Sequence, residues 1–372
     1  MTTVQSAAAA GAPAQPAIRI VKTGPRGLAH PTSEFASLLA TIKEAGLLRR
    51  RRLFYILTFA VISVAMGGAW VGFAFLHNTW YELLIAAALG ILFTQFAFLA
   101  HEASHRQVWE SGKANDHTGR FIADLLVGIS YSWWMNKHSR HHAAPNTVDR
   151  DPDIDPDFIQ FQAKDAKALT GLPALLARRQ GWLFFPVLIF EGLNLHRHAF
   201  LTVFSRGRVD NRSIEIVLLL VRNIGYLAVL FTLLPVGVAF AFLGVQLAVF
   251  GIYMGASFAP NHIGMPQLPK DSKVDFLRRQ VLTSRNIRGG WGMDIYMGGL
   301  NYQIEHHLFP SMPRPHLRRA SEIVQEYCNA RDVKYTRTGV FEAYGIVVRH
   351  LNVVGLNADD PWNCPSAANF GR

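Results

Sequence analysis

Two pairs of long apolar segments dominate the hydropathy pattern of the chain. Residues 53–76 and 80–100 are each long enough to cross a bilayer core, which takes about 20 helical residues, and only a short polar turn separates them. A second pair follows at residues 214–234 and 236–258, joined at Pro235. The pattern therefore predicts an all-α polytopic membrane protein with four spans in two helical hairpins.

The third span is the least regular of the four. Glu215, Arg222 and Asn223 interrupt it, and an ionisable group at membrane depth costs several kcal/mol unless it is paired or faces a cavity. We therefore expect partners for these side chains. Residues 182–190 are also apolar but too short to cross, and they contain Pro186, so we expect an interfacial or buried segment there.

Composition and charge support membrane integration and suggest an orientation. Hydrophobic residues make up 50% of the chain and charged residues only 17%, which is too apolar for an ordinary soluble domain. The net charge of +11 comes with no nucleic-acid recognition motif, so we expect no nucleic-acid partner. Arginines at 49–52 precede the first span, and its turn has none. The positive-inside rule then places both termini in the cytoplasm, with the chain in the cell (inner) membrane.

Three regions follow from this pattern. Residues 1–48, whose beginning is rich in Ala, Pro, Thr and Gly and lacks the order of a signal peptide, are expected to be a disordered or weakly structured cytoplasmic tail. Residues 49–335 form the membrane domain, and residues 336–372 are expected to be a C-terminal cytoplasmic tail. The two cysteines, Cys328 and Cys364, form no paired motif, so any metal must be held by histidine or carboxylate.

Three histidine clusters lie outside the spans, on the predicted cytoplasmic side. They read H-E-A-S-H at 101–105, H-S-R-H-H at 138–142 and Q-I-E-H-H at 303–307. Spacings of three and four residues place side chains on one face of a helix. We therefore expect a metal site in a helical cap at the end of the spans.

The first cluster alone has a second interpretation. H-E-x-x-H is also the zincin signature, in which two histidines bind zinc and Glu102 would be the general base. A single catalytic zinc needs only one further protein ligand, whereas the chain offers at least five more imidazoles at metal-compatible spacing. The surplus favours two metals, but imidazole chemistry alone does not select iron over zinc.

The order of the three clusters around two helical hairpins resembles the histidine boxes of membrane fatty acid desaturases, including bacterial acyl-CoA and acyl-lipid desaturases. The resemblance covers about residues 50–320, and the run N-Y-Q-I-E-H-H-L-F-P is particularly similar. It implies a di-iron site, with no catalytic side chain beyond the metal ligands. Asn261 or Gln303 would bind weakly or through water. The implied iron ligands are His101, His105, His138, His141, His142, His262, His306 and His307.

The resemblance also implies an activity. The chain would use two ferrous ions and dioxygen to introduce a cis double bond into an acyl-CoA or acyl-lipid chain. Only His30-Pro31 is similar to the H-P-G-G motif of a fused cytochrome b5, so electrons are expected from a separate ferredoxin-like or cytochrome-type protein with its reductase. Delta-9 regiochemistry is favoured, while Gln303 keeps front-end delta-6 or delta-5 chemistry open.

Functions of other classes compete with this interpretation. They are a membrane di-iron lipid hydroxylase, an intramembrane zinc protease that uses Glu102, and a metal transporter. The last is disfavoured because transporters bind ions near the bilayer midplane, and the boxes lie beyond the spans. The aspartates at 149–157 lack the glycine and glutamate of a calcium loop. They are either a solvated loop or, with Asn146, acceptors of hydrogen bonds from the ligand imidazoles.

Overall fold

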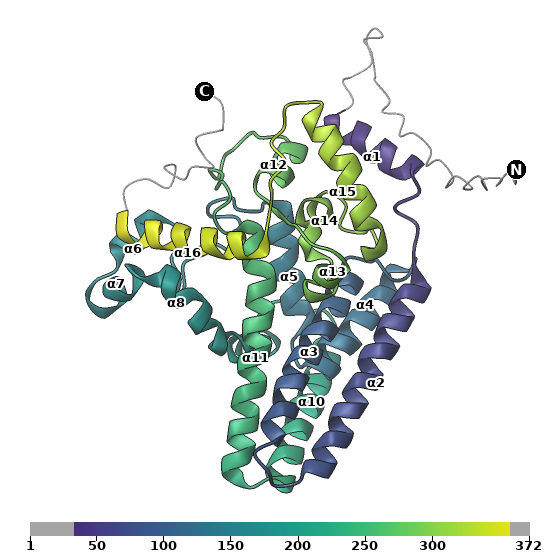
Figure 1. Cartoon of the computed structure of the whole chain (residues 1–372), viewed down its shortest axis with the longest axis vertical. Coiled ribbons are helices and arrows are strands. Elements are labelled where there is room, and N and C mark those ends of the chain that lie inside the picture. Colours follow the sequence, from purple (N-terminus) through teal and green to yellow (C-terminus); the bar gives the residue numbers. More distant parts are fainter. Residues whose placement is uncertain (1–32, 358–372) are drawn as a thin grey trace, which may run out of the picture.

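Four long helices form the membrane bundle. The computed structural model describes residues 33–357, and its four apolar helices long enough to cross a membrane are α2 (Arg52–Leu76), α3 (Glu82–Ser104), α10 (Arg212–Leu233) and α11 (Val236–His262). They run side by side below a helical cap (Figure 1). The only strands in the described part are a two-residue parallel pair, β1 (Asn286–Ile287) and β2 (Arg337–Thr338). The prediction of an all-α polytopic membrane protein with two hairpins is confirmed.

Two of the spans continue beyond their apolar segments. α3 was expected to end near residue 100 and α11 near residue 258, but the helices run on to Ser104 and His262. The extra turn of each helix carries polar residues that hydropathy assigns to a loop. Packing of these turns inside the cap stabilises them as helix, and each delivers histidine side chains to the same place.

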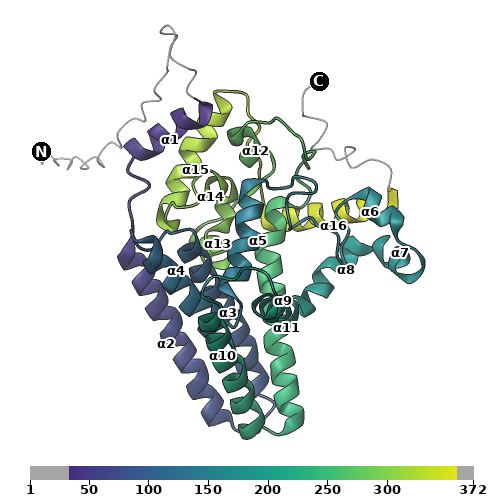
Figure 2. The same cartoon turned by 180° about the vertical axis from the view of Figure 1, so that it is seen from behind.

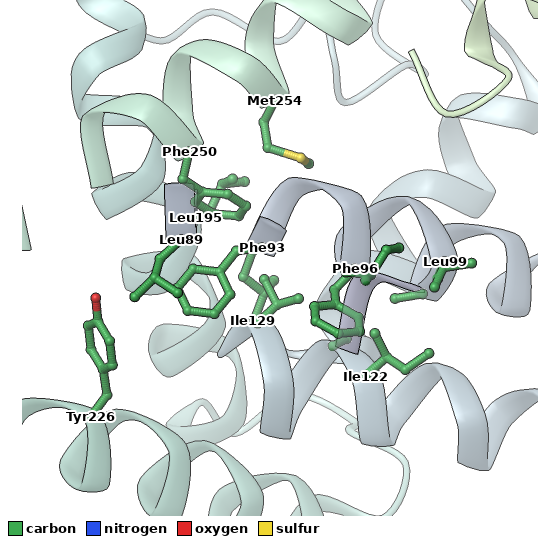
Figure 3. Close-up of a cluster of buried hydrophobic side chains, with 14 of the residues drawn as sticks. Leu89, Phe93, Phe96, Leu99, Ile122, Ile129, Leu195, Tyr226, Phe250 and Met254 are labelled. Atoms are coloured by element: carbon green, nitrogen blue, oxygen red, sulfur yellow. The ribbon is translucent and has the colours of Figure 1, made fainter. Parts of the chain in front are cut away.

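The core of the bundle lies where α3 meets α11 (Figure 3). Phe93 and Phe96 of α3 pack near Phe250 of α11, and Tyr226 closes the cluster from α10. The two main helices approach closely at Gly90, where an added Cβ would lie 2.8 Å from the carbonyl oxygen of Gln246. Small residues at such crossings are typical of membrane helices, because association there depends on close van der Waals packing.

The polar residues of the third span all have partners. The buried carboxylate of Glu215 accepts hydrogen bonds from Arg120 Nε at 3.2 Å and Ser130 Oγ at 2.6 Å. Arg222 donates to the carbonyl oxygen of Leu126 at 3.0 Å. The expected pairing is therefore present, and the limits of α10 agree with the predicted 214–234. Ser130 is also the N-cap residue of the helix Tyr131–Ala143. Its hydrogen bond to Glu215 therefore joins that helix to the membrane bundle.

The cap packs against the ends of α2, α3 and α11. The cap has a core of buried apolar residues separate from that of the bundle, and this core includes Leu38 and Ile42 of α1, which are fully buried. The expectation of a disordered or weakly structured tail over residues 1–48 is therefore wrong for residues 34–44, while residues 1–32, including His30, lie outside the described part. The helices of the cap are α1 (Glu34–Glu44), α4 (Gly112–Arg120), the π-helix η1 (Phe121–Val127), α5 (Tyr131–Ala143), α12 (Phe276–Leu282), α13 (Trp291–Tyr296), the 3-10 turn η3 (Leu300–Tyr302), α14 (Gln303–Leu308) and α15 (Arg314–Asn329).

A lateral arm extends from the bundle beside the cap (Figure 2). The longest helix of this arm, Val340–Asn357, lies in the segment that was expected to be a C-terminal tail. The carbonyl oxygen of its Leu351 accepts a hydrogen bond from Gln180 at 2.9 Å. Residues 182–190 are partly buried, because Phe184 and Leu188 are covered while Trp182 is exposed. Cys364 lies outside the described residues. The arm consists of α6 (Ala163–Ala168), α7 (Gly171–Ala177), α8 (Gln180–Val187), η2 (Leu188–Phe190), α9 (Glu191–Phe204) and α16 (Val340–Asn357).

Candidate metal centre

Four helix segments bring the predicted ligands together. The ends of α3 and α11, the C-terminal half of α5 and the whole of α14 converge in the cap. Within each of two groups, one nitrogen per imidazole lies within 4.8 Å of the others. The first group is His101, His105, His138, His142 and His306, and the second is His141, His262 and His307.

The first group is compact and electrically neutral. Nε2 of His138 lies 3.0 Å from Nε2 of His101 and 2.7 Å from Nε2 of His105. Burial, together with the nearby His141, lowers the pKa of His105 to about 3. Burial and neighbouring imidazoles likewise hold the pKa of His138 and His142 well below its usual value. Neutral imidazole is the form that binds metals, so these residues are ready ligands.

The two histidine groups are in direct contact with each other. The rings of His142 in the first group and His307 in the second are stacked, with centroids 4.1 Å apart. The ring centroids of His141 and His262 are 4.6 Å apart on the other side of the second group. Two neighbouring clusters of imidazoles, rather than one, lie at the junction of the boxes. The arrangement offers two separate sets of nitrogen ligands, which is more than a single zinc requires.

Several imidazole nitrogens at this junction have no hydrogen-bond partner. They are both ring nitrogens of His142 and the Nε2 atoms of His306 and His307. Buried polar atoms in proteins nearly always have a partner, so orphaned ones need an explanation. All of these atoms belong to the two histidine groups, and a metal ion is the partner that such nitrogens can take. The donor set therefore fits a metal pair.

Asp151 orients one of the ligands. Nδ1 of His141 lies 3.0 Å from both carboxylate oxygens of Asp151, which is fully buried and also accepts the backbone N–H of Asn146 at 2.7 Å. Burial lowers the pKa of His141, but the attraction of Asp153 and Asp151 outweighs it, and the net pKa is raised. Because a carboxylate only accepts, Nδ1 carries the proton and Nε2 is left for the metal.

Replacing Asp151 by Asn should weaken metal binding without removing a ligand. The amide can present its NH₂ to His141 Nδ1 and favour the wrong tautomer, and loss of such a partner typically costs roughly 10–100-fold in metal affinity. Metal titration of purified protein measures the effect. The matched control is Asp149→Asn, a neighbouring exposed aspartate that pairs with Lys164. Equal affinities for the two variants would contradict the orienting role.

Sequence reasoning missed other partners of the ligands. Gln280 on α12 accepts the proton of His307 Nδ1 at 3.0 Å and donates to the carbonyl oxygen of His142 at 3.1 Å. Thr283 offers its carbonyl oxygen to His262 Nδ1 at 3.0 Å. Both residues lie far along the chain from the imidazoles that they hold. No local pattern marks them, so only the fold reveals them.

Gln303 and Asn261 lie beside the second group. Nε2 of Gln303 is 2.9 Å from Nε2 of His262, and its oxygen accepts a hydrogen bond from Asn261 at 3.1 Å. Asn261 Oδ1 is buried without a partner. Since His262 Nδ1 donates its proton elsewhere, its Nε2 lone pair faces Gln303. Gln303 thus lies next to the ligand nitrogen of His262, where weak or water-mediated binding is expected.

Glu102 is not placed to act as a zincin base. Both of its oxygens accept hydrogen bonds from Arg314, from Nε and Nη2, each at 2.6 Å. The pair is almost completely buried, and a fork of this kind is among the strongest charge-assisted contacts. A carboxylate engaged in this way does not activate water. Arg314 lies 212 residues from Glu102 along the chain, so no local sequence pattern indicates this role.

The remaining histidines of the described part belong to neither group. His316 Nδ1 donates to the carbonyl oxygen of Leu47, and His196 Nδ1 donates to the carbonyl oxygen of Gly192 in its own helix. His198 stacks on Trp133 with ring centroids 5.7 Å apart. His350 lines a cavity described below. None of these four histidines belongs to a candidate metal-binding group.

Comparison with known proteins decides the family. The family model described as "Fatty acid desaturase" matches residues 78–339, which is more than half of the chain. This chain belongs to the fatty acid desaturase family. It is therefore an oxidoreductase of a family that acts on fatty acyl chains with dioxygen and generally uses two irons.

Named relatives of the desaturase come from several eukaryotes. It is 29% identical to a delta(8)-fatty-acid desaturase of Borago officinalis, over 88% of this chain and 76% of the relative. It is 30% identical to an acyl-lipid (9-3)-desaturase of Physcomitrium patens, over 87% and 64%. A delta(6)-fatty-acid desaturase of Caenorhabditis elegans is 28% identical over 85% and 74%. None of these relatives is named as a delta-9 desaturase, so they give no support to the expectation of delta-9 chemistry.

The desaturase has a large cavity that reaches the two histidine groups. The cavity has a volume of about 690 Å³ and lies between α5, α8, α9, α11 and α16. His138, His141 and His262 line its inner end. A smaller, nearly apolar pocket beside His101 shares five lining residues with it, namely Trp133, Trp134, Leu195, Met254 and Phe258. The two spaces adjoin along one side of the first histidine group.

Proposed function

We propose that this desaturase introduces a cis double bond into an acyl chain that lies in this cavity, in an oxygen-dependent reaction. The observation that carries the proposal is the junction of eight clustered imidazoles, in two groups, with a space lined largely by apolar side chains. The polar end of a substrate would remain at the cavity mouth. Its hydrocarbon chain would pass Trp134 and Phe258 toward the small pocket beside His101. In this pose, methylene groups of the acyl chain would lie against the histidine groups.

We propose that the eight histidines hold two iron ions. Iron bound there would supply the redox chemistry that activates dioxygen and removes hydrogen from an unactivated methylene group. The chain itself supplies nitrogen ligands of defined tautomer, because Asp151, Gln280 and Thr283 each accept one imidazole proton. It also excludes water, because the ligands are largely buried. Gln303 and Asn261 are proposed as weak or water-mediated ligands.

For the position of the double bond we propose front-end chemistry, at a carbon nearer the carboxyl group than delta-9. The support is the set of delta(6) and delta(8) relatives, together with Gln303 at the start of the third box. The acyl carrier is a CoA thioester or a lipid.

Lipid analysis tests the function directly. Wild type and His306→Ala are expressed in a host without desaturases, in air, with defined saturated fatty acids. Gas chromatography with double-bond derivatisation should show cis olefins only for wild type. Hydroxylated chains in place of olefins would identify a membrane hydroxylase instead. Unsaturated products formed without oxygen would contradict the proposal, and a delta-9 product would refute the front-end position.

We also propose that electrons come from a separate acidic carrier of the ferredoxin or cytochrome type with its reductase. Among the described residues no flavin or haem motif is present, and the net charge of the whole chain is +11. Charge complementarity of this kind mainly accelerates encounter. Turnover by purified enzyme with substrate and dioxygen should therefore require an added donor and slow as salt increases.

The proposed orientation has both termini and the metal centre in the cytoplasm. It rests on the arginines before α2 and on the absence of Lys and Arg from the α2–α3 turn. A reporter fused after Ala100, or at the C-terminus, is expected to give a cytoplasmic signal, because each fusion follows an even number of spans. Reporters that differ in their preferred compartment provide the control. An external signal at either place would contradict the orientation.

A further inference from the structure

Three elements of the lateral arm form one bent helix. α8, η2 and α9 follow one another without a gap, so the backbone of residues 180–204 is helical throughout. Pro186, which cannot donate a backbone hydrogen bond, precedes the 3-10 turn, and α8 and α9 run in different directions (Figure 2). A continuous helix satisfies its own backbone groups, which hydrocarbon requires of any segment that it surrounds. The backbone of this bent helix is therefore compatible with lipid.

The middle of the bent helix packs against the middle of α11, below the cap (Figure 2). A Cβ added to Gly192 would lie 2.2 Å from the carbonyl oxygen of Leu247, and one added to Gly251 would lie 2.4 Å from that of Leu188. At about 1.5 Å per residue, Leu247 and Gly251 lie about 17 and 22 Å along α11 from Val236. A bilayer core is about 30 Å thick. With the α10–α11 turn at one boundary, this contact lies within the core.

The two ends of the bent helix are also attached. At its start, the backbone N–H of Gly181 donates to Asn352 Oδ1 of α16 at 3.0 Å. At its end, the first residue of α10, Arg212, donates to the carbonyl oxygen of Val203 at 2.8 Å. The helix thus descends from α16 to the middle of α11 and then continues to the start of α10. These three attachments fix its position relative to the spans.

The outward face of η2 and α9 is a stripe of large apolar side chains. Positions 190, 193, 197, 201 and 204 are spaced by three or four residues, so they share one side of the helix. Phe190, Leu193, Leu201 and Phe204 are each between 53% and 61% exposed. Arg197 is the one charged member, and its long apolar stem lets the guanidinium reach the head-group level. A helix face in contact with water carries mainly polar residues, so this stripe is not typical of such a face.

The polar side chains of α9 lie on a different face from the stripe. Glu191, Asn194 and His198 line the cavity that reaches the histidine groups. A helix at the surface of a soluble domain has the opposite order, with its polar face outward. In membranes, by contrast, polar side chains face a cavity or the protein interior, and apolar side chains face lipid. The order of faces on α9 is that of a helix in contact with lipid.

We infer that residues 180–204 enter the leaflet on the side of the cap, and that the acyl chains of this leaflet cover the outward stripe. The stripe is continuous with a lipid-facing surface, because α9 leads into the span α10, whose Ile214, Val217 and Val221 are also more than half exposed. This contact is additional to the four spans and independent of the reaction. Because Phe190 lines the cavity as well, part of the cavity wall then lies below the membrane surface.

Spin labelling of the full-length protein in phosphatidylcholine vesicles tests this contact. A nitroxide is attached to one introduced cysteine in a Cys364→Ser background. Burial raises the pKa of the remaining Cys328 thiol to about 12, which keeps it unreactive. The test positions are Leu193→Cys and Leu201→Cys.

Two further labelled positions provide matched references. Val64→Cys on α2 is the reference for lipid, and Glu322→Cys on α15 is the reference for water. All four labelled positions are exposed, so the substitutions preserve folding, which size-exclusion chromatography checks. At each position, collision of the nitroxide with dioxygen, which concentrates in hydrocarbon, is compared with collision with a nickel chelate, which remains in water.

The ratio of oxygen to chelate collisions decides the outcome. We expect the ratio at Leu193 and Leu201 to approach that at Val64 and to exceed that at Glu322 by about threefold or more, because polar solutes are excluded from hydrocarbon. A smaller excess at both positions would place the stripe in water and overturn the inference. Low collision rates with both reagents would show that protein, such as a second copy of the chain, covers the stripe, which would overturn it equally.

Discussion

His306→Ala is expected to lose iron and to abolish double-bond formation. His306 lies within the first histidine group, with ring centroids 4.8 Å from His101 and 4.7 Å from His105 and His142. Its Nε2 has no other partner, so removing the ring removes a donor that nothing nearby replaces. Iron content should fall from about two per chain to one or fewer, because binding of each metal depends on its full ligand set.

The two-group geometry sharpens this prediction. His262→Ala removes a ligand of the second group only, so it should retain about one iron per chain. His198→Ala and His316→Ala alter histidines outside both groups and should retain wild-type iron. His316 also lies outside the cavity lining, so His316→Ala is the control for activity. Iron is measured by elemental analysis and activity by lipid chromatography. Purified wild-type protein with a single zinc and no iron would refute the di-iron centre and revive the zincin interpretation.

Arg314→Met is expected to be the most destabilising substitution outside the ligands. It leaves the buried carboxylate of Glu102 without its partner, and breaking a buried ion pair in this way typically costs about 3–5 kcal/mol. Arg314 also donates its backbone N–H to Tyr55 at 3.1 Å, so disturbance there would spread to α2. Thermal unfolding in detergent should show a large decrease in midpoint, and iron content should fall because Glu102 lies between ligands His101 and His105.

The double variant Glu102→Gln with Arg314→Met is the decisive control. If the uncompensated charge causes the loss, removing both charges should restore much of the stability. A double variant as unstable as the sum of the two single variants would show instead that packing of the Arg314 side chain is what matters.

The membrane bundle and the ligand set could be predicted from sequence because both depend on local patterns. Hydropathy marked all four spans, and spacings of three and four residues identified the helical boxes. His262 was harder, because it stands alone, and only the resemblance suggested it. The structure places it 4.6 Å from His141 between ring centroids. No local pattern in A-P-N-H-I-G-M-P implies that contact.

What the sequence did not reveal depends on contacts between distant segments. Helix α1 was taken as part of a tail because the sequence before it is rich in Ala, Pro, Thr and Gly, yet Leu38 and Ile42 pack into a core formed with α14 and α15. The pairing of Glu102 with Arg314 spans 212 residues. Gln280 likewise holds His307 from another helix. Such partners are set by the fold, so periodicity carries no signal for them.

The convergence of ligands from both hairpins has a consequence for biogenesis. The first and second boxes are synthesised well before α10 and α11, whereas His306 and His307 come after the last span. Neither histidine group is complete until α14 has been made and docked. A partly synthesised chain therefore holds no finished iron site, and metal loading must follow insertion of the second hairpin. Iron limitation in the cell should accumulate inserted but unloaded protein, with a cap more open to proteolysis, instead of blocking membrane insertion.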